Sequence, residues 1–202
     1  MSVLVFIDQS EGHIKKSSFE AASYGAKVAE QLGTTAEGIV LGSVTDNVAA
    51  LGNYGIKKIY TVADAALNSF DAQVYTKVIA QAAANADVVI FSNTTTGKAV
   101  APRLSVKLKA GLVSGAVALP DTSNGFTVKK TVFSGKAFAN ISVTTAKKII
   151  ALNPNSFTII TSTIYYPHII IRGQLYIISC AIPFLSNISG FKYNLSPSII
   201  NF

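Results

Sequence analysis

Continuous apolar runs of strand length alternate with helical stretches through the first half of the chain. The run "VLVFI" at residues 3–7 is rich in Val and Ile, as expected of a strand buried on both faces of a parallel sheet. Further runs of this kind predict strands at residues 38–41, 58–62 and 88–91. Between them, apolar residues recur every three or four positions, which predicts amphipathic helices. Such alternation with short connections is typical of right-handed βαβ units on a mostly parallel sheet.

Local signals predict where the first two helices begin and end. Ser17 or Ser18 is expected to cap the first helix, because a hydroxyl accepts hydrogen bonds from the first helical N–H groups. Gly33 is expected to end it, since glycine adopts the left-handed conformation of a helix terminus. Asp46 is expected to cap a second helix that ends near residues 52–55.

Two more helices follow. The stretch "SNTTTGKAVAPRLSVKL" begins with threonines at residues 94–96 that can cap a helix. Pro102 is expected to be tolerated near the start of this helix, where N–H groups lack partners. The apolar positions of the two helices are Val74, Val78, Ile79 and Ala82 in the first, and Val100, Leu104 and Leu108 in the second.

The period changes after residue 111. Residues 112–119, 126–133 and 138–152 have the composition and alternation of strands, and the Ser-Gly-Lys turn at 134–136 joins the last two. We expect them to extend the sheet with antiparallel edges. The predicted fold class is therefore α/β, a nucleotide-binding-like three-layer fold with a mostly parallel sheet, flanking helices and an antiparallel extension.

The composition changes again after the break signal "NPNS" at residues 153–156. Residues 158–202 contain twelve isoleucines, three of the six prolines, one alanine and no acidic residue. We therefore predict two parts, an α/β domain at residues 1–157 and an irregular, aberrant, hydrophobic tail at residues 158–202 that is not a native domain.

The distribution of charge and the small number of Cys and His residues exclude several function classes. The net charge is +7, but the lysines are scattered in pairs without a basic helix or an aromatic RNA-binding string, so no nucleic-acid partner is predicted. One cysteine, Cys180, and two histidines are too few for a zinc site, and no metal is predicted. No secretion or transit signal precedes the first strand, which predicts a cytoplasmic location.

The Gly-Lys pair of "TTTGK" invites comparison with a phosphate-binding loop. That loop requires Gly-x-x-x-x-Gly-Lys followed by Ser or Thr, and here Ser92 and Ala99 occupy the first-glycine and hydroxyl positions. No Gly-x-Gly-x-x-Gly or Gly-x-Ser-x-Gly sequence is present either. His13, in a polar loop, is expected to be solvated, so no catalytic residue is predicted.

Four stretches together resemble the amino-terminal domain of the electron transfer flavoprotein alpha subunit. They are "VLVFIDQSEGHIKKSSFEAASYGAKVAEQLG", "LGNYGIKKIYTVAD", "ADVVIFSNTTTGKAVAPRLSVKLKAGLVSGAVAL" and "VFSGKAFANISV", in the family's order and spacing. The resemblance covers about residues 2–157. Its most specific pattern contains Gly97, Lys98, Pro102 and Arg103. We assign these residues a structural or interface role in preference to a cofactor-binding role.

The resemblance implies a part in electron transfer. Family members are alpha/beta heterodimers that carry FAD and move electrons from flavin dehydrogenases, such as the acyl-CoA dehydrogenases of fatty acid beta-oxidation, to an acceptor. They are electron carriers rather than catalysts. FAD is held mainly by a carboxy-terminal domain whose signature is absent here, so no FAD-binding residue is assigned. We expect this truncated chain to be inactive alone, to retain no FAD and to recognise a beta subunit.

Two other functions remain open at this stage. Residues 173–191 form an uncharged run near the length of a membrane span, although Gln174, Pro183 and Asn187 disfavour insertion. A stand-alone nucleotide-binding α/β protein is the other alternative. For the tail itself, we hypothesise that a frameshift or misjoining near codon 157 replaces the second domain.

The tail generates a first testable prediction. Apolar, strand-prone segments with almost no charge aggregate when exposed. A chain ending at Phe157 is therefore expected to remain in solution at higher concentration than the full chain, as measured by ultracentrifugation after expression at matched levels. Equal solubility of the two chains would contradict this expectation.

Overall fold

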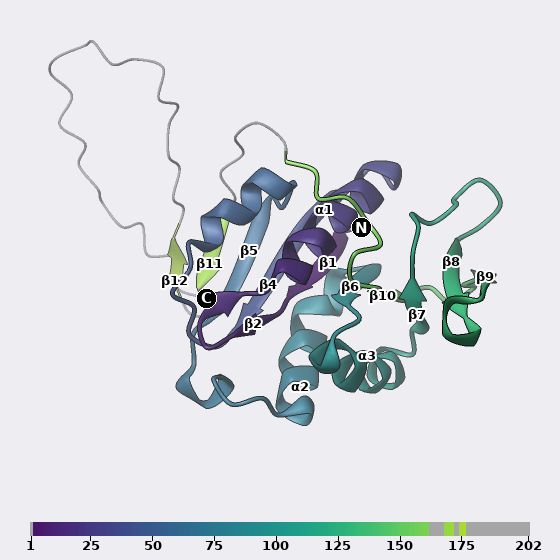
Figure 1. Ribbon diagram of the computed structural model, residues 1–202. Helices are drawn as coiled ribbons and strands as arrows, with labels where there is room; N and C mark the ends of the chain where they lie inside the picture. The colour runs from purple at the N-terminus through teal and green to yellow at the C-terminus, as the bar shows by residue number, and fades with distance from the viewer. Residues whose placement is uncertain (1, 162–167, 172–173, 177–202) are drawn as a thin grey trace, which may run out of the picture.

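The computed structural model describes residues 2–161, 168–171 and 174–176. In this part of the chain, ten strands form one sheet in the order β12-β11-β5-β4-β1-β6-β10-β7-β8-β9 (Figure 1). The run from β11 to β7 is parallel throughout, whereas β8, β9 and β12 pair antiparallel. The predicted α/β class with a mostly parallel sheet and an antiparallel extension is confirmed.

The elements have the following bounds. The strands of the large sheet are β1 Ser2–Ile7, β4 Thr35–Leu41, β5 Lys58–Val62, β6 Val88–Ser92, β7 Gly111–Ala116, β8 Thr127–Val132, β9 Ala137–Ser142, β10 Lys148–Leu152, β11 His168–Ile171 and β12 Gln174–Tyr176. A two-stranded sheet contains β2 Gln9–Ser10 and β3 His13–Ile14. The α-helices are α1 Lys16–Gln31, α2 Ala72–Ala82 and α3 Thr95–Leu108, and the 3₁₀ helices are η1 Val48–Tyr54, η2 Ala65–Leu67, η3 Ala83–Asn85 and η4 Phe133–Gly135.

Helices cover both faces of the sheet, which explains why its central strands are apolar throughout. In β1, Val5 belongs to the core under α1, and its neighbours Leu4 and Phe6 belong to the opposite core under α2 and α3 (Figure 1). Successive strand side chains point to opposite faces, so a strand between two helix layers needs apolar residues at every position. Full burial of each such side chain contributes roughly 1.5–3 kcal/mol.

Strand β10 differs from its predicted position. Residues 138–152 were expected to form an antiparallel edge, but only β9 lies at the edge. The chain leaves the sheet after Ser142 and returns as β10, which inserts in parallel between β6 and β7. All residues of β10 but Lys148 are buried, and the run Ile149, Ile150, Ala151, Leu152 has the continuous apolar composition of a central strand.

Two capping predictions are wrong. The first helix begins at Lys16, and no side chain caps it; the hydroxyl of Ser18 instead donates to the carbonyl of Asp8 at 2.8 Å. The side chain of Asn47, not Asp46, caps η1 by accepting a hydrogen bond from Ala49. Gly33, with a positive φ, follows the last residues of α1 as predicted.

The predicted break after β10 is held to α1 by a buried carboxylate. Glu20 is 5% exposed, and its two carboxylate oxygens accept hydrogen bonds from the backbone N–H groups of Asn155, Ser156 and Phe157 at 2.7–2.9 Å. The Phe157 ring then packs edge-on against Tyr24. Beyond it, Ser23 exchanges two hydrogen bonds with the backbone of Ile160, so the chain stays on α1 past residue 157.

A lysine supports the opposite face in a similar way. The ammonium group of Lys147 donates to the carbonyl oxygens of Ala83, Ala84 and Ala86 at 2.7–2.9 Å. These carbonyls end α2 and η3, where helical C=O groups lack intrahelical partners. Lys147 lies directly before β10, so it ties the start of this strand to the end of α2.

Within the predicted tail, two described segments extend the sheet. β11 pairs in parallel with β5, and β12 pairs antiparallel with β11. Most of the uncharged run 173–191, and Cys180 with it, lies outside the described residues. The division of the chain at residue 157 stays a prediction.

The Glu20 contact predicts a stability change. Replacing Glu20 with Gln removes the charge and one acceptor oxygen from three partly buried hydrogen bonds, which is expected to lower the free energy of unfolding by about 2–4 kcal/mol. Urea denaturation of the parent chain and of Glu20→Gln measures this difference in the free energy of unfolding. Glu30→Gln is the control, because Glu30 is an exposed partner of Lys27 and the change should have little effect. Equal losses in the two variants would rule out a special role for Glu20.

Gly97 generates another prediction. A Cβ atom at this position would overlap with the backbone carbonyl oxygen of Ser92, which cannot move without distorting β6. Gly97→Ala is therefore expected to cost about 2 kcal/mol or more in urea denaturation, despite the better helix propensity of Ala. Gly25→Ala is the matched comparison, because a Cβ there meets a side-chain methyl group of Val5 and not a backbone atom. A smaller loss for Gly97→Ala than for Gly25→Ala would contradict the backbone argument.

Candidate functional site

The carboxyl ends of β1 and β6 mark the point at which the strand order changes direction. β1 continues through α1 to β4 on one side, and β6 lies on its other side. Ligands of open α/β sheets bind in the crevice at such a switch point. Asp8 directly follows β1, and Asn93 and Thr94 directly follow β6, so these residues define the candidate site.

An ion pair of the chain itself fills this crevice. The carboxylate of Asp8 is buried, and its Oδ2 accepts hydrogen bonds from the Lys15 ammonium and the Thr94 hydroxyl, both at 2.9 Å. Lys15 is the N-cap residue of α1 and Thr94 that of α3. The Asp8 carboxylate thus lies between two helix N-termini, the environment that favours a bound anion. Because the protein supplies this anion, a nucleotide phosphate would meet a like charge, and the crevice does not fit one.

A chain of amide and hydroxyl groups continues from this point across the sheet. Asn93 donates from its amide nitrogen to the Asn153 side-chain oxygen at 2.7 Å, and Asn153 donates to the Thr131 hydroxyl at 3.1 Å. The Ser114 hydroxyl donates to the Asn93 oxygen at 3.3 Å. These residues follow or belong to β6, β10, β8 and β7, so the network ties the carboxyl edge of β6, β10 and β7 to the antiparallel strand β8.

The residues of the family pattern do not converge on one site. Gly97 is buried against β6, with its N–H donating to the Thr94 cap at 3.3 Å. Lys98, Pro102 and Arg103 are exposed on the outer side of α3, facing away from the sheet. Their assignment to a structural or interface role stays a prediction.

The expectation that Pro102 lies near the start of its helix is wrong. α3 begins at Thr95, so Pro102 lies in the helix interior, where it leaves the Lys98 carbonyl without its usual N–H partner. Both residues are exposed, and solvent can satisfy that carbonyl. The predicted cap at residues 94–96 is confirmed by Thr94.

Titratable groups outside the crevice serve local structure. The Ile14 N–H, and then the His13 side chain, hold the pKa of Asp46 below its usual range. The His13 ring is largely exposed and lies 2.9 Å from Asp46, as expected for a solvated loop residue. On the other face, the backbone N–H groups at the start of α2 lower the pKa of Asp71, and the nearby charge of Arg103 adds to this.

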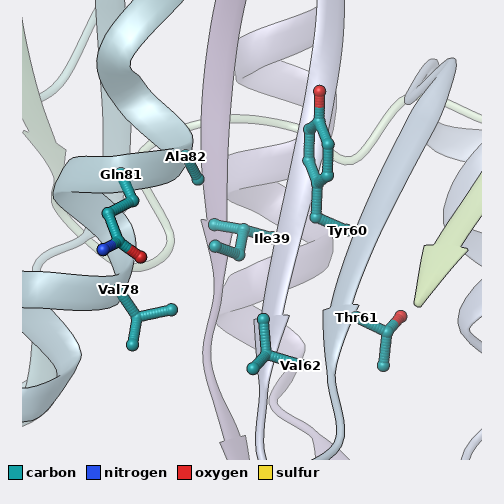
Figure 2. A pocket seen from close by; sticks show the side chains of 7 residues that line it. All are labelled: Ile39, Tyr60, Thr61, Val62, Val78, Gln81 and Ala82. Carbon is teal, nitrogen blue, oxygen red and sulfur yellow. The ribbon is translucent and has the colours of Figure 1, made fainter. Parts of the chain in front are cut away.

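A hollow between β5 and α2 lies apart from the crevice. It has a volume of about 190 Å³, and aliphatic side chains such as Ile39, Val62 and Val78 line most of it (Figure 2). The Tyr60 hydroxyl points out of its upper end in Figure 2 and donates to Glu37 at 3.2 Å. Its volume is below that of usual cofactor pockets. Its lining contains no charged side chain.

Sequence reasoning missed Asp8, Lys15 and Glu20. Each is an ordinary charged residue of a loop or helix, and the fold brings its partners from other segments. One signal was available, since a carboxylate directly after a buried parallel strand lies at the switch point. Among the described residues, no group of three or more His, Cys, Asp or Glu side chains could hold a metal ion. In the same part of the chain, no helix combines the length and apolarity needed to span a membrane.

Comparison with known proteins adds an independent line of evidence. The chain is 28% identical over 157 residues to the electron transfer flavoprotein subunit alpha of Bacillus subtilis, covering 76% of this chain and 48% of that protein. The corresponding protein of Syntrophomonas wolfei is 27% identical over 69% of this chain and 44% of its own length. Protein FixB of Clostridium saccharobutylicum is 27% identical over 69% and 43%. The chain thus spans less than half the length of these relatives.

The family match covers nearly all of the described structure. The family model described as "Electron transfer flavoprotein domain" matches residues 3–165, which includes the strands and helices from β1 to β10. The resemblance predicted from the sequence is confirmed. The chain belongs to the electron transfer flavoprotein domain family.

Proposed function

We propose that this chain is the amino-terminal part of an electron transfer flavoprotein alpha subunit, and that it acts by assembling with a beta subunit into an FAD-carrying heterodimer. The family match over residues 3–165 and the names of its relatives support this. In that role the heterodimer receives electrons from flavin dehydrogenases, such as acyl-CoA dehydrogenases, and passes them to an acceptor. A cytoplasmic location is part of the proposal.

FAD chemistry is assigned to the assembled protein and not to this chain. A dinucleotide needs a phosphate-binding helix N-terminus and a pocket of several hundred cubic ångströms. Here the Asp8–Lys15 pair fills the crevice between α1 and α3, and the described residues do not fit the cofactor. We therefore propose that this chain alone retains no FAD and transfers no electrons.

The exposed hairpin β8–β9 is the observation that carries the proposed assembly role. Phe133 is 80% exposed, Phe138 60% and Ile141 38%, and β9 is an outermost strand of the described sheet. β9 contains no charged residue and no proline. Monomeric proteins usually protect such an edge, since its free N–H and C=O groups recruit other strands. A partner subunit that covers the hairpin would bury both the aromatic side chains and the free edge.

The alternative functions are less well supported. A stand-alone nucleotide-binding protein needs a crevice that accepts phosphate, and Asp8 occupies that place. For a membrane protein, the family match and the names of the relatives offer no support, since they favour electron transfer.

The proposed assembly is tested by mixing the chain with an electron transfer flavoprotein beta subunit and measuring the mass of the complex by light scattering. We expect a one-to-one complex. The double variant Phe138→Asp/Ile141→Asp should weaken it by about tenfold or more, because charged groups would replace apolar contacts at the edge. Val74→Asp is the control, since Val74 is similarly exposed but lies on α2, away from the hairpin.

Three outcomes would contradict the proposal. They are the absence of a complex with intact chain, an equal effect of the hairpin and α2 variants, and visible flavin absorbance that remains with the chain alone after gel filtration. Circular dichroism of each variant confirms that a lost complex does not result from a lost fold.

A further inference from the structure

The charges of this protein are divided between two ends of the sheet. Residues 2–94, which contain β1, β4, β5, β6, α1 and α2, carry nine acidic and six basic residues. Residues 95–161, which contain α3, β7, β8, β9 and β10, carry nine basic residues and one acidic residue, Asp121. α3 and the β8–β9 hairpin lie at the same end of the molecule (Figure 1). The net positive charge of the described chain is therefore concentrated at that end.

The outer side of α3 is the most ordered part of this positive end. We define the basic face as Lys98, Arg103, Lys107 and Lys109, all of which are exposed. The buried residues of α3, including Gly97, Val100 and Leu104, lie on the other side of the helix. With 3.6 residues per turn, Lys98 and Lys107 lie on opposite margins of the exposed side, and Pro102 and Val106 lie between them.

One of these cations, Arg103, acts on the carboxylate of Asp71 at the start of α2, whose pKa its charge helps to lower. The ion pairs His13–Asp46, Lys15–Asp8 and Lys27–Glu30 lie at the other end of the chain and include none of the four cations. Asp121, the single acid of residues 95–161, accepts hydrogen bonds from Ser123 in its own turn. α3 itself contains no acidic residue. Arg103 and Lys107 are like charges four residues apart on this helix and repel one another, and an acidic partner would relieve that repulsion.

An apolar side chain stands in the middle of the basic face. Val106 is 81% exposed, and with Pro102 it forms a short apolar strip between the cations. An apolar centre inside a charged rim is the usual arrangement of a protein–protein interface. A nucleic-acid surface would instead offer aromatic rings for base stacking. The exposed ring of Phe138, on the β8–β9 hairpin, is covered by the Lys129 ammonium group, which lies 4.5 Å from the ring centre.

We propose that the basic face of α3 is a docking surface for an acidic protein surface, in which carboxylates pair with the cations around a small apolar contact on Val106. The surface is distinct from the hairpin edge, because it lies on a helix and not on the free strand β9. The cations would speed encounter with the partner, and the apolar strip would add to the lifetime of the complex.

The test uses the full chain with two defined acidic polymers, poly-L-glutamate and a random copolymer of glutamate and tyrosine. Binding to each is followed by fluorescence anisotropy at two salt concentrations. We expect salt-sensitive binding of both polymers and tighter binding of the copolymer. Lys98→Glu/Lys107→Glu should weaken both by about tenfold or more, and Val106→Asn should remove only the copolymer's advantage.

The control variant is Lys16→Glu/Lys57→Glu, which makes the same change in net charge on exposed lysines at α1 and before β5, away from α3. We expect it to bind within about twofold of the parent chain. Equal weakening by the two double variants would overturn the proposal, since net charge alone would then explain binding. Tighter binding of duplex DNA than of the copolymer would overturn it in favour of a nucleic-acid partner. Concentration-dependent dimerisation that Lys98→Glu/Lys107→Glu abolishes would overturn it in favour of a second copy.

Discussion

The insertion of β10 between β6 and β7 sets the geometry of the whole carboxyl half of the domain. A strand with helices over both faces and a strand on each side must be apolar at nearly every position, and β10 meets this demand from Ile149 to Leu152. Because β10 occupies the place beside β6, β7 is displaced outward, and the β8–β9 hairpin is displaced further still. The turn after β10 then lies against α1, where Glu20 binds it. The free hairpin and the turn bound by Glu20 are two results of one strand order.

Features set by local composition were predictable, and those set by long-range contacts were not. The runs at residues 3–7, 58–62 and 88–91 are strands because a buried parallel strand has one composition wherever it lies. The position of β10 could not be predicted, since its apolar run fits an edge and a central place equally well until its neighbours are known. The Ser18 and Asp46 caps were wrong for a related reason: each side chain has a competing partner, Asp8 or Ile14, from another segment. Of the candidate site, the α3 cap and the family pattern were visible, but the Asp8–Lys15–Thr94 contact joins three separate segments.

The proposed functions of this domain lie on its surface, at the hairpin and the basic face, and not in the crevice of the sheet. The place where related α/β folds bind phosphate holds an internal carboxylate, so the strand–helix framework is kept while its usual ligand site is closed. What the fold still presents outward is an apolar edge and a helix with exposed cations. Both belong to the segment after β6, which carries all but one of its ionisable groups as bases. The two halves of the sheet therefore differ in role as well as in charge.

The late position of β10 in the chain also has a consequence during synthesis. β6 and β7 are complete some thirty residues before β10 emerges, yet they are never neighbours in the finished sheet. Until residue 152 has left the ribosome, each presents an open inner edge, and direct pairing of one with the other would close the sheet in the wrong order. The wrong pairing is avoided if β6 and β7 stay apart until β10 has emerged. A pause in translation before β10 would favour the wrong pairing, because it lengthens the time in which β6 and β7 can meet without β10.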